Sequence, residues 1–176
     1  MTRLPLLRDD QVGPPDVVDA IRQRRGGQLL ELDRLLLHSP AFASGWNEFL
    51  GKVRTSLQIE ALWRELAMCG VAVLNGAEYE LTQHAPLYQR AGGTAAQVEA
   101  LRRLGDGAES DPAFDASQQA VLALVLEMTR QVHVSDATFA RARAVMGSDA
   151  RMFELIGVIA AYNMVSRILV AAQLEP

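Results

Sequence analysis

Cysteine is almost absent from this chain. Its 176 residues include one cysteine, Cys69. A single thiol excludes an internal disulfide, a zinc site built from cysteines and a redox cycle that needs two thiols in one chain. Hydrophobic residues make up 49% of the sequence, which is enough for a sizeable core and excludes a disordered chain. The chemistry of this protein is therefore expected to use groups other than sulfur.

An excess of positive charge and a long unbroken apolar run are also missing. The formal net charge is −4, which argues against a protein that binds nucleic acid or an anionic membrane. The longest apolar stretch, residues 152–172, is interrupted as in a buried helix rather than a membrane span. The interrupting residues are Glu154, Gly157, Asn163 and Arg167. The first residues have too short an apolar run for a signal peptide, so we expect a cytoplasmic protein.

Strand signals are missing as well, because alternation of apolar and polar residues nowhere continues over five residues. Helical periodicity, N-cap residues and glycine stops occur along the whole chain instead. The predicted fold class is therefore all-α, a helical bundle of eight or nine helices. The expected helices cover about residues 15–25, 29–37, 40–53, 58–74, 77–91, 94–104, 117–131, 135–146 and 149–172.

The most informative stretch contains an acid on an apolar helix face and a nearby histidine. Glu65 has apolar neighbours three and four positions away, so its carboxyl group needs a partner or a proton. Glu80 and His84 are four residues apart and share a helix face. A tight turn at Asn75-Gly76 would fold this second helix back and bring Glu65 and His84 together. A buried Glu–His pair is a proton-handling unit, since each partner moves the pKa of the other.

The spacing of these residues resembles the carboxymuconolactone decarboxylase and alkylhydroperoxidase-D-like superfamily. Redox members carry a glutamate, eleven residues, a cysteine, two residues, a second cysteine, three residues and a histidine. The glutamate falls on Glu65 and the histidine on His84, whereas the two cysteine positions fall on Ala77 and Glu80. The chain is therefore similar to a branch of the superfamily that lacks both cysteines.

The resemblance also implies a domain organisation and an assembly. It extends over roughly residues 42–169, so we expect an N-terminal helical arm over residues 1–40 and one helical family domain over residues 41–176. Several expected helices are apolar on more than one face and need covering on both sides. The resemblance points the same way, and we expect a homo-oligomer: a dimer, a trimer or a hexamer.

The missing cysteines decide which reaction the resemblance favours. Peroxide reduction needs an attacking thiolate and a resolving thiol, and Ala77 and Glu80 supply neither. Decarboxylase members resemble this chain in needing no cysteine, metal or cofactor. We therefore expect a carboxy-lyase-like enzyme, without thiol peroxidase activity, that applies acid–base chemistry to a small carboxylated lactone or ring.

By this resemblance, His84 is the candidate acid or hydrogen-bond donor, and Glu65 orients and tunes it. Tyr79 is a candidate second donor, and Glu80 is a carboxylate oriented on His84. An arginine that the sequence does not single out would hold the carboxylate of the substrate.

Each of these residues also has a structural interpretation. Glu65 can be a buried partner of a neighbouring helix, and His84 can be a residue at a helix end or on the surface. Glu80 can be solvated, and Tyr79 can be a packing aromatic. For the whole protein, the alternatives are a peroxidase-like antioxidant protein, which the missing thiols disfavour, and a non-catalytic oligomeric binding protein.

Overall fold

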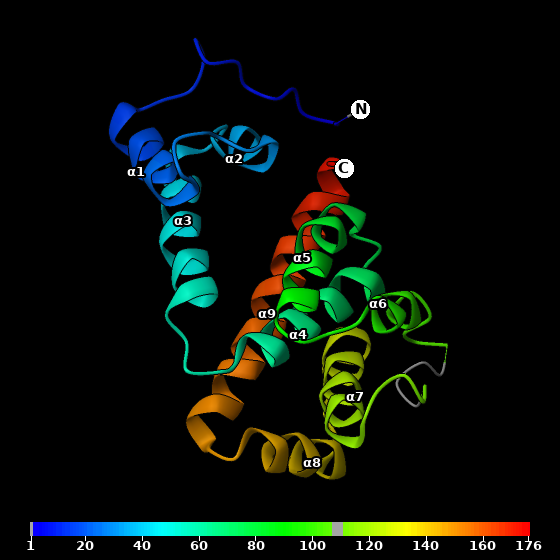
Figure 1. The fold of residues 1–176 in the computed structure, drawn as a ribbon. Coiled ribbons are helices and arrows are strands. Elements are labelled where there is room, and N and C mark those ends of the chain that lie inside the picture. The colour runs from blue at the N-terminus through cyan, green and yellow to red at the C-terminus, as the bar shows by residue number, and fades with distance from the viewer. Residues whose placement is uncertain (1, 107–110) are drawn as a thin grey trace. The chain divides into compact units, whose positions relative to one another are not determined.

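The computed structural model describes residues 2–106 and 111–176, and over these ranges the chain forms nine α-helices and no strand (Figure 1). The predicted all-α class is confirmed. The helices are α1 Pro15–Arg25, α2 Glu31–Leu36, α3 Pro40–Thr55, α4 Ala61–Leu74, α5 Glu78–Arg90, α6 Ala95–Leu101, α7 Ala116–Arg130, α8 Asp136–Met146 and α9 Asp149–Ala172. Residues 107–110 of the predicted loop between the sixth and seventh helices lie outside the described residues.

The chain divides into two compact units. The first contains residues 1–57 and 172–174, and the second contains residues 58–171 and 175–176. The predicted division into an N-terminal arm over residues 1–40 and one helical domain over residues 41–176 stays a prediction.

The first unit is held by a buried acid on α2. The Asp33 carboxylate is 1% exposed and accepts hydrogen bonds from the Arg25 guanidinium, with the Nη2 to Oδ1 distance at 3.0 Å. It also accepts the backbone N–H of Leu30 at the start of α2. A buried charge is stable only when it is paired and hydrogen-bonded, so Asp33 ties α1 to α2.

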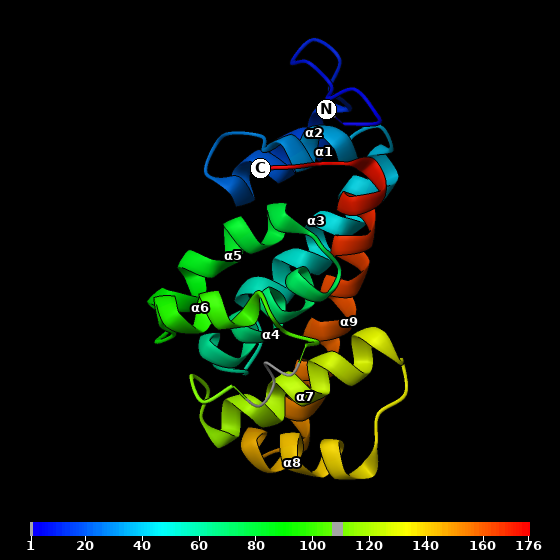
Figure 2. The ribbon, with the colours of Figure 1, turned by 90° about the vertical axis from the view of Figure 1, so that its right-hand side faces the viewer.

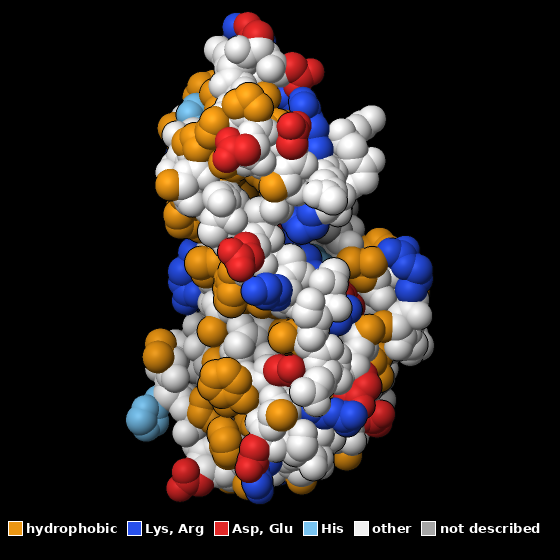
Figure 3. Space-filling model, turned by 90° about the vertical axis from the view of Figure 1, so that its left-hand side faces the viewer, with side chains coloured by type: hydrophobic (Ala, Val, Ile, Leu, Met, Phe, Trp, Pro, Cys, Tyr) orange, Lys and Arg blue, Asp and Glu red, His pale blue; other side chains and the backbone are white. Residues whose placement is uncertain are grey.

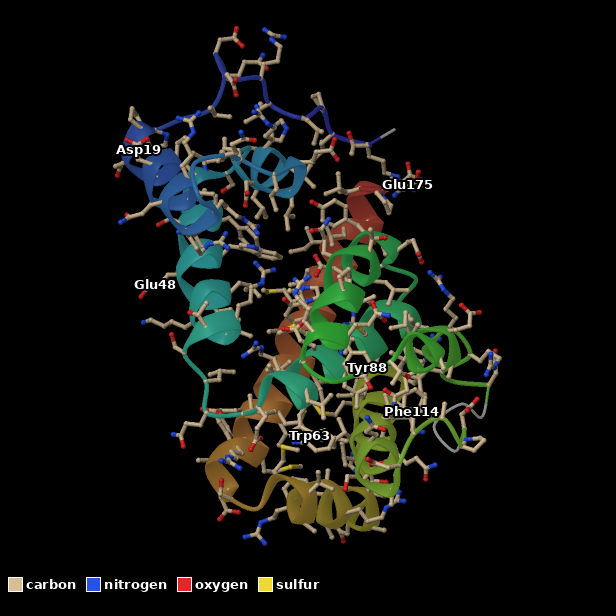
Figure 4. The ribbon with its side chains drawn as sticks, viewed as in Figure 1. Asp19, Glu48, Trp63, Tyr88, Phe114 and Glu175 are labelled. Atoms are coloured by element: carbon tan, nitrogen blue, oxygen red, sulfur yellow. The ribbon has the colours of Figure 1, made fainter. Side chains whose placement is uncertain are left out.

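The second unit is organised around α4, which packs most extensively against α5 and α7, while α7 pairs with α8 (Figure 2). Residues 65–72 of α4 are all buried, because this helix is apolar on more than one face and has neighbours on both sides. Gly70 allows close packing of α7: an added Cβ there would lie 3.1 Å from a Val125 methyl carbon. Figure 4 shows the side chains of α4, α5 and α9 crowded between these ribbons, with Trp63 labelled on α4 and Tyr88 on α5.

The predicted tight turn joins α4 to α5. Gly76 has a φ of +67°, a left-handed conformation that glycine adopts without a steric penalty. The backbone N–H of Ala77 donates to the carbonyl of Ala72 at 2.8 Å, which closes the turn. The turn therefore sets α5 against α4, as the sequence predicts.

Side chains cap three helices, and a glycine ends one of them. Thr94 and Gln97 form a capping box at α6, Asp115 caps α7, Ser135 caps α8, and Gly147 ends α8 in a left-handed conformation.

The start of α4 lies at Ala61, three residues later than predicted. The Glu154 carboxylate of α9 accepts the backbone N–H groups of Gln58 and Ile59, both at 2.8 Å. A side chain from a distant helix thus accepts hydrogen bonds from these two N–H groups. In a longer α4 they would be among the first N–H groups of the helix, which have no partner within it.

Helix α9 is long and apolar enough to cross a membrane by length and composition, and half of its most apolar window is buried inside the structure. The core helix of a soluble protein has the same properties. Phe153 and Val170 of α9 are 74% and 45% exposed. On the face drawn in Figure 3, hydrophobic side chains lie in small groups among charged ones.

Candidate functional site

Three helices of the second unit bring four polar side chains together, which we call the imidazole cluster: Glu65 of α4, Glu80 and His84 of α5, and Tyr162 of α9. Each of these residues is at most 5% exposed. Glu80 lies in the first turn of α5, where the helix dipole favours a negative charge. His84 follows one turn later, so α5 presents both groups on one face.

One nitrogen of His84 is bound to Glu65. The distance from His84 Nδ1 to Glu65 Oε2 is 2.7 Å, which is short enough for a charge-assisted hydrogen bond. The predicted meeting of these two residues is therefore present, although they are 19 positions apart in the sequence. The other Glu65 oxygen accepts a hydrogen bond from Arg64 Nε at 3.3 Å.

The other nitrogen of His84 faces two oxygens. His84 Nε2 lies 3.0 Å from the Tyr162 hydroxyl and 3.2 Å from Glu80 Oε2. The Glu80 contact has the distance of an ion pair, but Oε2 has no hydrogen-bond partner among the described residues. The Tyr162 ring meets the imidazole edge-on, with ring centres 5.0 Å apart. Glu80 therefore holds a buried oxygen that still lacks a donor.

The two carboxylates determine the charge of the imidazole. Burial by itself lowers the pKa of His84, but the hydrogen bond to Glu65 and the negative charges of Glu65 and Glu80 outweigh it, so the pKa is raised above its ordinary value. The imidazolium form is thus stabilised between two acids. Such an arrangement can hold a proton in a buried place and release it to a nearby base.

Residues 40–123 match the model of the carboxymuconolactone decarboxylase family. Over this segment, which is a little under half of the chain, the sequence is similar to that family. A solved structure with a similar fold is that of an uncharacterized peroxidase-related protein from Silicibacter sp. TM1040. That protein is 19% identical, the match covers 99% of this chain and 90% of that one, and the TM-score is 0.78. No curated protein matches the chain.

Neither position of the two-cysteine motif in the redox pattern contains sulfur in this chain. The resemblance aligns these two positions with Ala77 and Glu80. Ala77 is buried beside the turn. Cys69 on α4 is fully buried, and its pKa is raised by burial and then by the negative charges of Glu65 and Glu80. Its thiol stays protonated, which makes it a poor nucleophile.

Tyr79, the predicted second donor, is 7% exposed and lies on α5 next to Glu80. Successive residues of a helix are about 100° apart, so Tyr79 leaves the helix on a different side from Glu80 and His84. Its catalytic role stays a prediction.

Tyr162 is the residue of the cluster that the sequence analysis missed. It lies 78 residues after His84, so no local spacing connects the two. The available signal was a tyrosine in the middle of an otherwise apolar helix, because a buried hydroxyl group needs a partner.

The described surface hollows lie at other places. One of about 620 Å³ is formed by α8 and the residues after it: Phe139, Ala140, Arg143, Ala144, Gly147 and Ser148. Another of about 400 Å³ belongs to the first unit and is lined by Asp9, Arg22, Gly27, Gln28, Leu29 and Arg34. Within residues 2–106 and 111–176, no group of three or more His, Cys, Asp or Glu residues is arranged to hold a metal ion.

Proposed function

We propose that this protein is an enzyme that removes carbon dioxide from a small carboxylated lactone or ring by acid–base chemistry. The class is a carboxy-lyase, and the proposed reaction uses no cofactor. The match of residues 40–123 to the carboxymuconolactone decarboxylase family model supports the class of reaction. The proposed location is the cytoplasm.

One observation carries the proposal: an imidazole buried between two carboxylates, at 2.7 Å from Glu65 and 3.2 Å from Glu80. Decarboxylation leaves an electron pair on the substrate that spreads onto the lactone oxygen, and a proton must then reach carbon. A buried imidazolium can donate a hydrogen bond to that oxygen or deliver that proton. Charge interactions are stronger in such a site than in water.

The proposed steps assign one role to each group. The bond between the substrate carboxylate and its carbon breaks, carbon dioxide leaves, and the electron pair stays on the dienolate. His84 donates the proton that is added to carbon and is then protonated again by solvent, while Glu65 orients the imidazole. Glu80, with its unpartnered oxygen, relays the proton from solvent to His84 Nε2. Tyr79 remains the proposed second donor to the dienolate oxygen.

For the substrate carboxylate we propose Arg64. Its guanidinium adjoins the cluster through Glu65 Oε1, and its side chain is 17% exposed, so it is accessible from solvent. A guanidinium matches the geometry of a carboxylate and brings the positive charge that the cluster, with two acids and one imidazolium, lacks. Its replacement by methionine is expected to raise KM more than it lowers kcat.

The test is turnover of a carboxymuconolactone, followed by release of carbon dioxide. His84→Gln is expected to lower kcat by about 10²–10⁴-fold, the usual contribution of a positioned acid, and Glu65→Gln is expected to follow it. His133→Gln is the control, since His133 is an exposed histidine. Folding of each variant is checked by circular dichroism. Unchanged turnover in a folded His84→Gln protein, or no turnover by the wild type, contradicts the proposal.

We also propose that the chain forms a homo-oligomer. Large apolar side chains that are exposed in the single chain, among them Phe153 and Val170 of α9, support this proposal, because a contact between subunits would cover them. Light scattering coupled to size-exclusion chromatography measures the mass in solution. A mass of one chain, 19.2 kDa, contradicts it.

A further inference from the structure

We infer that Tyr162 is a positioning residue whose hydroxyl group allows the buried His84 to gain and lose a proton without moving. This inference rests on the proposed function, because acid–base turnover requires His84 to alternate between its two charge states.

The argument begins with the two sides of the imidazole. Nδ1 is committed to Glu65 at 2.7 Å, and a carboxylate can only accept, so Nδ1 carries a hydrogen in both charge states. All variation in protonation therefore takes place at Nε2. This nitrogen faces the Tyr162 hydroxyl at 3.0 Å and Glu80 Oε2 at 3.2 Å.

The two oxygens at Nε2 differ in what they can do. A tyrosine hydroxyl can donate or accept, whereas an ionised carboxylate can only accept. When His84 is positively charged, its Nε2–H donates toward the Tyr162 oxygen or Glu80. When His84 has given up that proton, Nε2 becomes an acceptor, and the Tyr162 O–H rotates to donate to it. One rotation of a hydroxyl group thus serves both states.

Without Tyr162, the neutral state would lose its only described donor. Nε2 would then face the Glu80 carboxylate with two acceptors in contact and no hydrogen between them. A buried acceptor without a donor is costly, so the imidazole would remain charged and would hold its proton too tightly to release it. Tyr162 therefore makes the proton of His84 transferable.

All described charged and titratable groups around the imidazole enter this balance. Glu65 approaches from α4 with Arg64 at its far oxygen, and Cys69 lies on the same helix. Glu80 approaches from α5 and Tyr162 from α9. The carboxylates favour the charged imidazole, and Tyr162 provides the hydrogen bond that the neutral form needs.

The experiment is a titration of the His84 imidazole by nuclear magnetic resonance, and no substrate is needed. The chain has three histidines, so His38 and His133 serve as internal references. Tyr162→Phe is expected to move the His84 midpoint upward by about one pH unit, the equivalent of one buried hydrogen bond. Glu80→Gln is expected to move it downward. Tyr88→Phe, which removes another buried hydroxyl from α5, is the matched control and is expected to leave it in place.

A second measurement uses the wild-type protein, in case Tyr162→Phe does not fold. Nitrogen-15 shifts above the midpoint are expected to show the remaining proton on Nδ1 and an accepting Nε2. A proton on Nε2 in the neutral form, or a Tyr162→Phe midpoint that stays or falls, overturns the inference. Loss of stability without a change in the midpoint assigns Tyr162 a packing role only and also overturns it. Absence of lactone turnover in the wild type would instead contradict the proposed function and leave the titration result standing.

Discussion

Two buried polar clusters share helix α5, one turn apart, and each includes a tyrosine hydroxyl group. Around Tyr88, three side chains form a closed ring that we call the amide ring. The Tyr88 hydroxyl donates to Gln97 at 2.9 Å, the Gln97 amide donates to Gln118 at 2.9 Å, and the Gln118 amide donates back to Tyr88 at 3.3 Å. Around His84, the imidazole cluster combines two acids, an imidazole and the Tyr162 hydroxyl.

The two clusters differ in charge and in completeness. In the amide ring, each group is matched, and Gln97 and Gln118 also cap α6 and α7, so the ring joins three helices. Gly93 lies so near that an added Cβ would be 2.4 Å from the Tyr88 ring. The imidazole cluster instead keeps Glu80 Oε2 without a hydrogen bond. A neutral network in which each group is hydrogen-bonded helps to specify a fold. A charged network that contains an oxygen without a hydrogen bond is suited to proton transfer.

The largest expected effect comes from giving the imidazole cluster the chemistry of the amide ring. The triple variant Glu65→Gln, Glu80→Gln, His84→Gln is expected to lose lactone turnover by about 10²–10⁴-fold. Its free energy of unfolding is expected to stay within about 1–2 kcal/mol of the wild type, because the whole charged group is removed at once and no buried charge is left without its partner. Chemical denaturation and kinetic assays measure the two quantities. Turnover that survives the triple change would erase the distinction between the clusters.

Tyr88→Phe is expected to have the opposite pattern. It leaves Gln97 and Gln118 without their shared hydroxyl partner, which is expected to lower the free energy of unfolding by about 1–3 kcal/mol. Turnover is expected to remain at the wild-type value, since the reacting groups are untouched. Denaturant unfolding and kcat, measured on one preparation, test this. A drop in kcat that is larger than the loss of stability explains would show that the amide ring takes part in the chemistry.

A pH series separates the clusters by charge alone. The pKa of His84 is raised in the folded protein, so its contribution to stability is complete below the ordinary histidine pKa of about 6.5. That contribution is lost as the pH rises through the folded-state pKa. The wild-type free energy of unfolding is therefore expected to fall over this window, and that of the triple variant is expected to stay flat. A wild-type curve that rises with pH there would reverse the sign and contradict the raised pKa.

The smallest expected effect concerns Glu127, a carboxylate with a purely structural role. It accepts hydrogen bonds from the Thr138 hydroxyl and the Ser135 backbone N–H, both at 2.7 Å, and these lower its pKa. Glu127→Gln is expected to cost about 0.5–1 kcal/mol, as for loss of a helix cap, and to leave kcat unchanged. This stabilisation is present above the ordinary glutamate pKa and is lost as the pH falls through the lowered value. Unfolding at pH 7 and at acidic pH compares the two proteins, and equal acid sensitivity would refute the assignment.

The sequence predicts the parts of the site that are close together along the chain. Glu65 and His84 are linked by one turn, so helical spacing and the Asn75-Gly76 turn are enough to predict their contact. Tyr162 lies on α9, far from His84 in the sequence. Only the packing of α9 against α5 determines which side chain of α9 contacts the imidazole.

The amide ring shows the same limit. The Thr94–Gln97 capping box follows from a four-residue pattern, but both glutamines also form a hydrogen bond with Tyr88, which no local pattern indicates. The late start of α4 has a similar origin, because the Glu154 carboxylate that replaces its first turn lies 96 residues away from Gln58. Local rules thus give the helices and their caps, while contacts between distant helices need the folded structure.

Because Cys69 is fully buried, the reactivity of its thiol reports opening of the folded structure. It has no exposed surface and its thiol remains protonated, so alkylating reagents can reach it only when the second unit opens. The rate at which iodoacetamide modifies this one position therefore reports how often the core comes apart, and the sequence provides that probe without any engineered label.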